Sequence, residues 1–266
     1  MKGKTTGIGL LLVAVMLLVT ACGGKQPATT PPAAAPVELT VSAAVSMKEA
    51  LQEAQALYQA KQPNVKITFN LGASGSLQKQ IEEGAPVDLF LSAAVKQMDD
   101  LEKKGLLKKE TRKNLVENQL VLIVGKESKL AVASFNDLTK PEVKQFAMGA
   151  PETVPAGQYT QQVLKKLQLT EAVKDRTVLA KDVRTVLAYV ETGNAEVGAV
   201  YKTDAASSDK VRVVATAPPD THDPILYPMA VLAASKNVEA ATAFAAFLSG
   251  PEARTIFEKH GFTAAK

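Results

Sequence analysis

Short apolar runs alternate with amphipathic segments from residue 37 onward, and this alternation restricts the fold more than any other feature of the chain. Val37–Val45 and Val65–Leu71 are apolar, β-prone runs. Between them, apolar residues recur at helical spacing over Met47–Gln59, a helix that Ser46 is predicted to cap. Strands that alternate with helices in this way predict βαβ units, so we expect an α/β protein with a mainly parallel sheet.

Two long apolar runs divide the chain. Asn118–Gly125 reads NQLVLIVG, an almost unbroken hydrophobic strand of the kind that is buried on both faces. A self-contained α/β series follows it and ends before the second run, Tyr227–Ala234. We therefore predict two lobes joined by two crossover strands, with a hinged cleft between them. Lobe I would comprise residues 37–117 and 221–266, and lobe II residues 118–220.

The N-terminal segment has the pattern of an export signal. Two lysines precede the apolar stretch Ile8–Val19, which is shorter than a bilayer span, so residues 1–21 are predicted to be a lipoprotein signal peptide. The sequence VTACG around Cys22 resembles the bacterial lipoprotein processing box, which predicts acylation of Cys22. An unmodified free thiol is the alternative, since a lone cysteine has no partner for an internal disulfide. Residues 22–36 are rich in proline and alanine and are predicted to be an extended tether.

Charge and histidine content exclude some classes of function. The 31 basic residues are nearly balanced by 27 acidic ones, so the chain has no basic footprint for nucleic acid. His222 and His260 are the only histidines, and they lie far apart without cysteine partners. We therefore expect no metal site of protein ligands and interpret both histidines as surface residues.

Four polar segments stand where an apolar run gives way to a helix: Val45–Met47, Gly72–Ser76, Val154–Gly157 and Lys181–Arg184. The start of a helix carries unpaired backbone N–H groups and about half a positive charge, which suits an anion. Several starts that converge from two lobes would hold a small, fully ionised oxyanion with neutral donors alone.

Several motifs occur in a fixed order along nearly the whole of residues 37–266. They are Val41–Ser46, Gly84–Phe90, Gly149–Gly157, Asp182–Arg184, Val200–Tyr201, Gly250–Ala253 and His260–Thr263. In this order they resemble the molybdate-binding proteins of bacterial ABC importers. The resemblance implies a two-lobed periplasmic-binding-protein fold of type II that closes around molybdate or tungstate and delivers it to an ABC permease. It also implies a monomer that is not an enzyme, needs no cofactor and lies outside the cytoplasm, here with a lipid anchor to the membrane.

Carried over by position, the resemblance places five residues around the anion. Ser46 and Ser74 would each offer a hydroxyl and a backbone N–H. Ala156 and Val183 would offer backbone N–H groups, and Tyr201 its phenol. Two alternatives stay open, because both serines have the residue type of a simple helix cap, and Tyr201 has a place in the chain that suits a wedge in the hinge.

The chain departs from the commonest family pattern beside two of these donors. Gly75 stands where serine is frequent, and Val45 where alanine is expected. Asp182 and Arg184 flank another candidate donor, Val183, and we interpret them as pairing with neighbours outside the ligand shell.

The protonation state of the ligand favours molybdate. Molybdate is a dianion without a proton at neutral pH, so its oxygens only accept hydrogen bonds, whereas phosphate still carries a proton and needs an acceptor. The same fold with sulfate or another oxyanion is an alternative. A secreted serine hydrolase with Ser74, His222 and an aspartate is a further one, but the G-x-S-x-G elbow would need glycine where Ser76 stands.

Overall fold

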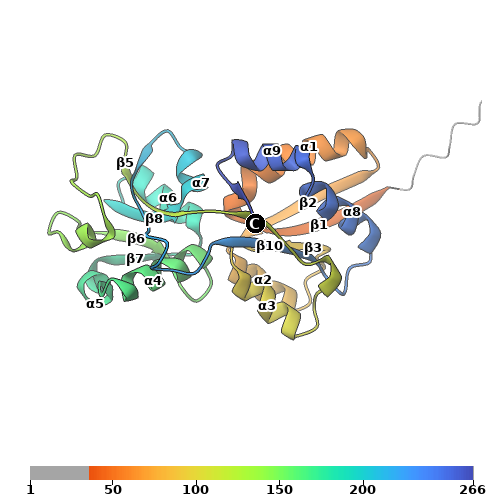
Figure 1. Cartoon of the computed structure of the whole chain (residues 1–266), viewed down its shortest axis with the longest axis horizontal. Helices are drawn as coiled ribbons and strands as arrows, with labels where there is room; N and C mark the ends of the chain where they lie inside the picture. The colour runs from red at the N-terminus through yellow and green to blue at the C-terminus, as the bar shows by residue number, and fades with distance from the viewer. Residues whose placement is uncertain (1–35, 266) are drawn as a thin grey trace, which may run out of the picture. The chain divides into compact units, whose positions relative to one another are not determined.

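A computed structural model describes residues 36–265 of the protein. The expected signal peptide, Cys22 and nearly all of the expected tether lie outside the described residues. Within residues 36–265, none of the helices is both long enough and apolar enough to cross a membrane. The described part consists of two groups of elements, each built around its own sheet (Figure 1).

The first sheet has six strands in the order β11-β4-β10-β3-β1-β2. β1 pairs in parallel with both β2 and β3, whereas β10 pairs antiparallel with β3 and β4, and β11 pairs antiparallel with β4. The strands are β1 Val37–Ala44, β2 Val65–Gly72, β3 Leu89–Leu91, β4 Lys113–Glu117, β10 Leu226–Val231 and β11 Thr263–Ala264.

The second sheet has five strands in the order β7-β6-β8-β5-β9. β6 pairs in parallel with β7 and β8, whereas β5 pairs antiparallel with β8 and β9. All residues from Leu120 to Val124 in β5 are at most 1% exposed, which confirms a strand buried on both faces. The strands are β5 Leu120–Gly125, β6 Phe146–Gly149, β7 Thr177–Ala180, β8 Val197–Tyr201 and β9 Val211–Thr216.

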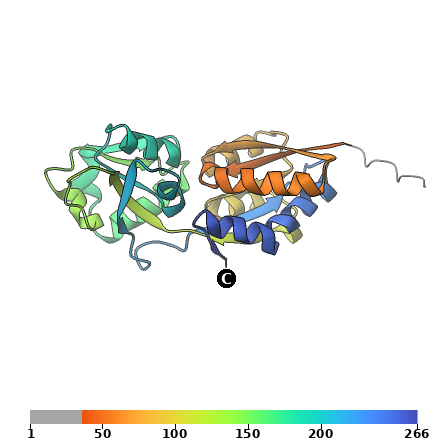
Figure 2. The same ribbon diagram turned by 90° about the horizontal axis from the view of Figure 1, so that it is seen from above.

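Helices cover both faces of each sheet (Figure 1). The chain runs from β1 through α1 to β2, then through α2 to β3 on the other side of β1. Both crossovers are expected to be right-handed. Because the chain first moves across the sheet to β2 and then back past β1 to β3, α1 and α2 lie on opposite faces. Figure 2 shows α1 lying along the first sheet. The helices are α1 Lys48–Lys61, α2 Ser74–Glu82, α3 Val95–Lys103, α4 Pro155–Lys166, α5 Thr170–Val173, α6 Val183–Glu191, α7 Lys202–Ala206, α8 Val238–Leu248 and α9 Pro251–Lys259, with 3₁₀ helices η1 Val45–Met47, η2 Lys109–Thr111, η3 Phe135–Thr139 and η4 Lys174–Arg176.

Two connections join the sheets, from β4 to β5 and from β9 to β10. The α/β class and the two crossovers agree with the sequence prediction, but the expected mainly parallel sheet was wrong because both sheets are mixed. Apart from β11 with β4, the antiparallel pairs involve β5 or β10, which enter from the other sheet without a helical crossover and so are free to run in the opposite direction. The exact lobe boundaries stay a prediction.

Candidate functional site

All five candidate donors lie at or after the carboxyl end of a strand that has a parallel neighbour. Ser46 and Ser74 follow β1 and β2, Ala156 and Val183 follow β6 and β7, and Tyr201 is the last residue of β8. β1 lies between β2 and β3, and β6 lies between β7 and β8, so the chain leaves each central strand first to one side and later to the other. Ligands of open α/β sheets bind at such switch points. Each of the five residues is at most 4% exposed.

Ser46 lies inside η1 and is not the cap of the following helix. The N-cap of α1 is Met47, because the chain makes a 3₁₀ turn after β1 before the α-helix begins at Lys48. The Ser46 hydroxyl instead lies 3.0 Å from the hydroxyl of Tyr227 on β10. The prediction that Ser46 caps this helix was therefore wrong.

Ser74 is the first residue of α2, whose N-cap is Ala73. Its Oγ accepts a hydrogen bond of 2.9 Å from the backbone N–H of Ala93, which follows β3. His222, the partner required by the hydrolase hypothesis, has its Nδ1 2.7 Å from the carbonyl of Asp223. Ser74 is thus held by a backbone donor and has no assembled histidine base in the described structure.

The second lobe presents two helix starts. α4 begins at Pro155, which favours the first position of a helix, so Ala156 is the second residue. α6 begins at Val183, and the Asp182 side chain caps it by accepting the backbone N–H of Thr185 at 2.7 Å. Backbone N–H groups in a first turn have no carbonyl partner within their own helix. The N–H groups of Ala156 and Val183 therefore occupy donor positions.

Tyr201 reaches from the second lobe to the first. Its hydroxyl donates to the carbonyl of Ala93 at 3.4 Å, and its ring lies edge-on to that of Tyr227 with centroids 5.7 Å apart. Burial raises the pKa of Tyr201 well above its usual value of 10, so the phenol keeps its proton at neutral pH. Ala93 thus links Ser74 to Tyr201, and Tyr227 links Ser46 to Tyr201.

The starts of α2 and α4 touch through the backbone. The N–H of Gly75 donates to the carbonyl of Thr153 at 2.9 Å. A Cβ at Gly75 would lie 2.6 Å from that oxygen and 2.8 Å from the Thr153 Cα, closer than real Cβ contacts. A side chain at position 75 would therefore collide with the backbone of Thr153, and glycine permits this close approach. The other departure, Val45, is partly buried and packs against the core.

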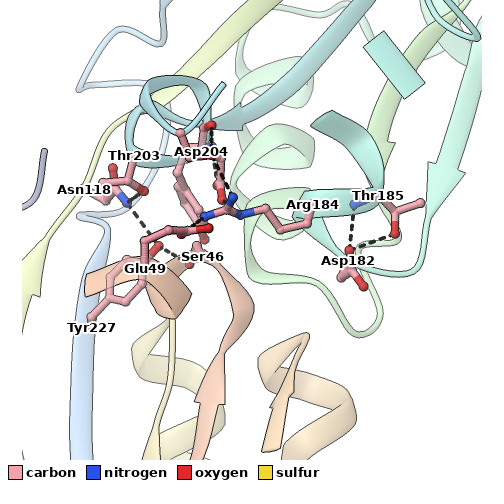
Figure 3. A network of polar contacts seen from close by, with 11 residues as sticks. Ser46, Glu49, Asn118, Asp182, Arg184, Thr185, Thr203, Asp204 and Tyr227 are labelled. Carbon is pink, nitrogen blue, oxygen red and sulfur yellow. Dashed lines mark hydrogen bonds and ion pairs between the residues drawn. The ribbon is translucent and has the colours of Figure 1, made fainter. Parts of the chain in front are cut away.

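An ionic network joins α1 to α6 (Figure 3). Arg184 pairs with Glu49 of α1, and its Nε lies 2.7 Å from Oδ1 of the fully buried Asp204. It also donates to the Ser207 hydroxyl at 2.7 Å. Asp182 and Arg184 therefore have partners, as expected from the sequence.

The protonation of Asp204 reflects a balance inside this network. Burial raises the pKa of Asp204 from its ordinary value of 3.8 to about 7, while the charge of Arg184 opposes the shift. The backbone N–H of Tyr201 donates to Asp204 Oδ2 at 3.3 Å. The network is thus next to two candidate donors, because Arg184 follows Val183 and Asp204 contacts Tyr201.

The two histidines lie at the surface, and each contacts one neighbouring side chain. His222 is partly buried and lies edge-on to Tyr159, and partly buried His260 contacts Glu53 at 2.9 Å through Nε2. Both side chains are partly exposed, which agrees with their interpretation as surface residues. Among residues 36–265, no group of three or more His, Cys, Asp or Glu is arranged to hold a metal ion.

Residues 39–263 match the model of the bacterial extracellular solute-binding protein family. The chain belongs to this family. The solute-binding protein is 41% identical over 237 residues to the molybdate-binding protein ModA of Haemophilus influenzae, covering 87% of this chain and 92% of that protein. It is 44% identical over 261 residues to Bacillus subtilis YvgL, named provisionally as an ABC transporter substrate-binding lipoprotein; the match covers 98% of this chain and 99% of YvgL.

A solved structure from Clostridium difficile is similar to the solute-binding protein with a TM-score of 0.68 and 49% identity. The match covers 86% of this chain and 100% of the Clostridium difficile chain. That structure is described provisionally as the substrate-binding domain of a molybdenum ABC transporter. These likenesses confirm the predicted two-lobed, type II binding-protein fold. They also confirm that the chain is a binding protein and not an enzyme, which removes the hydrolase hypothesis.

Sequence reasoning missed three polar residues of the solute-binding protein beside the candidate donors. Tyr227 contacts Ser46, Asp204 contacts Tyr201, and Asn118 contacts Tyr227. Asn118 and Tyr227 were assigned only to apolar runs, yet each is a polar residue at the end of such a run. This position was the available signal, because a polar side chain at a strand end lies at the edge of the sheet where ligands bind.

Proposed function

We propose that this protein captures molybdate, and also tungstate, between its two lobes by means of neutral hydrogen-bond donors. The observation that carries the proposal is the placement of five buried candidate donors at strand ends of both sheets. Hydrogen bonds to a charged group contribute about 1.5–3 kcal/mol each, and association costs about 4–15 kcal/mol. Several such bonds are sufficient for sub-micromolar affinity.

The serine geometry supports an unprotonated ligand. The Oγ of Ser74 already accepts a backbone N–H, so its proton is left for a ligand oxygen. The buried carboxylate of Asp204 is engaged by Arg184 and by the N–H of Tyr201. A protonated anion such as hydrogen phosphate would need an acceptor that these groups do not supply. The names of the Haemophilus influenzae and Clostridium difficile proteins agree with a molybdenum oxyanion.

Isothermal titration calorimetry of the mature protein with molybdate, tungstate, sulfate and phosphate tests the proposal. We expect one tight site per monomer for molybdate and tungstate. Sulfate should bind more weakly because its shorter bonds leave gaps to fixed donors, and phosphate more weakly still because its proton meets no acceptor. Tight sulfate binding without a response to molybdate would assign the fold to the alternative oxyanion, and tight phosphate binding would contradict the donor-only site.

We further propose that Cys22 is acylated and anchors the mature protein to the outer side of the cytoplasmic membrane. Cys22 lies outside the described residues, so the support is the VTACG pattern and the lipoprotein name of YvgL. Mass spectrometry of membrane-extracted protein should find a lipid mass on Cys22, and Cys22→Ala should release the protein or leave it unprocessed. An unmodified thiol on the mature protein would contradict the anchor.

Delivery to an ABC permease follows from the same proposal, with the protein acting as a monomer without a cofactor. Size-exclusion chromatography with light scattering should give a monomer with and without molybdate. The matching permease, reconstituted with the loaded protein, should show faster ATP hydrolysis than with the ligand-free protein. Equal stimulation by both forms would contradict ligand delivery by this chain.

A further inference from the structure

We propose that Asn118 and Tyr227 are positioning residues that fix the direction of the Ser46 hydroxyl proton, so that Ser46 donates it to the bound oxyanion. The inference rests on the proposed function and adds a determinant of selectivity to it. Asn118 lies in the connection from β4 to β5, Tyr227 near the start of β10, and Ser46 in η1 after β1, so the three side chains come from distant parts of the sequence and meet in the structure (Figure 3).

The orientation of the Asn118 amide is set by its neighbours. Its Oδ1 accepts the backbone N–H of Gln119 at 2.9 Å, which directs Nδ2 to the other side. From there Nδ2 donates to the hydroxyl of Thr203 at 2.9 Å and to that of Tyr227 at 3.2 Å. Because an amide nitrogen can only donate, the Tyr227 oxygen has to accept.

The direction then passes from Tyr227 to Ser46. Burial raises the pKa of Tyr227 well above 10, so its phenol carries a proton at neutral pH. Since the oxygen accepts from Asn118, this proton is available for the Ser46 Oγ, 3.0 Å away. Ser46 has one proton of its own, and once its oxygen accepts from Tyr227 that proton is free for a ligand.

Ser74 shows the same arrangement with a different donor. Its Oγ accepts the N–H of Ala93 at 2.9 Å, a backbone donor that cannot reverse its direction. The first lobe thus presents two buried serines whose oxygens are each next to a fixed or directed donor. The difference is that the donor to Ser46 is a side-chain relay, which a mutation can invert.

The backbone at Tyr227 is adapted to this contact. The pairing of β10 with β4 shifts register between Tyr227 and Pro228, an irregularity that re-aims side chains. Asn118 lies between β4 and β5, and the hydroxyl of Thr203 on α7 takes the second contact of its amide. The relay therefore spans the hinge, with Ser46 and Tyr227 on the first sheet's elements and Thr203 on a helix of the second lobe.

Asn118→Asp is the decisive substitution, because it keeps the shape and turns the donor into an acceptor. Tyr227 would then donate to Asp, accept from Ser46 and turn the Ser46 proton away from the ligand. We expect molybdate affinity to fall about 10- to 100-fold, the equivalent of one hydrogen bond to a charged group. The ratio of molybdate to hydrogen phosphate affinity should fall as well, since Ser46 would now present a lone pair.

Two further variants separate the effect of the added negative charge from the effect of the relay on molybdate binding. Gln119→Glu places the same charge on the adjacent, exposed residue outside the relay and should bind nearly as wild type. Asn118→Asp combined with Tyr227→Phe keeps the charge but cuts the relay, so Ser46 is again free to turn toward the ligand. The double variant should therefore bind molybdate more tightly than Asn118→Asp alone, whereas the loss of two independent favourable contributions would weaken binding further.

Calorimetry with molybdate and phosphate on these four proteins, together with apo melting temperatures, tests the inference. Recovery of affinity in the double variant, with the selectivity ratio restored, supports the relay. Equal or weaker binding by the double variant, or an unchanged selectivity ratio in Asn118→Asp, overturns it. If the wild type prefers sulfate to molybdate, the proposed ligand fails, and the same four proteins titrated with sulfate still decide whether the relay orients Ser46.

Discussion

The two lobes present their candidate donors in different chemical form. In the first lobe, Ser46 and Ser74 offer hydroxyl groups whose oxygens contact the Tyr227 hydroxyl and the Ala93 N–H. In the second lobe the backbone supplies the donors at the starts of α4 and α6, where position in the helix decides availability and the side chain does not. Residue type therefore identifies only the first wall, and substitutions should affect that wall most.

The comparison predicts its largest effect at the first-lobe hydroxyls. Ser46→Ala and Ser74→Ala should each weaken molybdate binding by about 1–3 kcal/mol, because each removes a buried donor to a charged ligand. Val183→Ala is the matched control from the second lobe, since it trims a buried side chain and leaves the backbone N–H in place. Calorimetry of the three variants would contradict the comparison if Val183→Ala lost as much affinity as the serine variants.

The alternating pattern could predict the elements because it depends on local periodicity and chain punctuation. The predicted runs Val37–Val45 and Val65–Leu71 match β1, Val37–Ala44, and β2, Val65–Gly72, to within one residue. The antiparallel crossovers were missed because the direction of a strand leaves no mark in its pattern of hydrophobic residues. The cap at Ser46 was wrong because a 3₁₀ turn precedes α1, and periodicity does not distinguish that turn from the helix.

The candidate site could be predicted only where a motif or residue type carries the donor. Ser46 and Ser74 are serines at strand ends, whereas Ala156 and Val183 came from the resemblance alone, and all of these assignments as ligand donors stay predictions. The contact between Asn118 and Tyr227 joins residues 109 positions apart. No local pattern specifies such a pair, because the contact depends on how the two crossover connections run side by side.

A second prediction concerns the ionic network behind the second-lobe donors. Asp204 has a pKa of about 7 in the folded protein, above its ordinary value of 3.8, chiefly because it is buried. The folded state thus binds this proton more tightly than the unfolded chain does, so the contribution to stability is full below pH about 4 and is lost as the pH rises through 7. Asp204→Asn cannot titrate and should lose this dependence.

The measurement is the free energy of unfolding of wild type and Asp204→Asn at pH 5 and pH 8. From pH 5 to pH 8 the variant should gain up to about 2–3 kcal/mol relative to the wild type, since each pKa unit of the interval is worth about 1.4 kcal/mol. Ser74→Ala removes no titrating group and keeps Asp204, so its pH profile should run parallel to that of the wild type and serves as the control. Parallel pH profiles for wild type and Asp204→Asn would show that the Asp204 carboxylate does not have a raised pKa. The second lobe would then have no titrating group behind its donors that affects stability between pH 5 and pH 8.

A third prediction uses the point where the two walls touch. Gly75→Ala places a Cβ against the backbone of Thr153, which cannot rotate away as a side chain would. We expect the clash to push the two helix starts apart and to weaken molybdate binding by about 1–2 kcal/mol, within the range for overpacking. Gly84→Ala is no suitable control because Gly84 has a φ of +90°. Gly125→Ala serves instead, since a Cβ there meets nothing within 4 Å and Gly125 has no positive φ. Wild-type affinity in Gly75→Ala would mean that the contact is not part of ligand binding.

The smallest effect is expected at Tyr201, the only second-lobe candidate whose donor is a side chain. Its hydroxyl lies 3.4 Å from the Ala93 carbonyl, at the long end of hydrogen-bond distances, so little is lost in the ligand-free protein when it is removed. If Tyr201 donates to the anion, Tyr201→Phe should weaken molybdate binding by about 1 kcal/mol with an unchanged apo melting temperature. If the ring is only a wedge in the hinge, phenylalanine fills the same space against Tyr227 and binding should stay normal. Titration of Tyr201→Phe beside Val183→Ala therefore decides whether the second wall acts through its backbone alone, and an affinity equal to wild type in both variants would establish that it does.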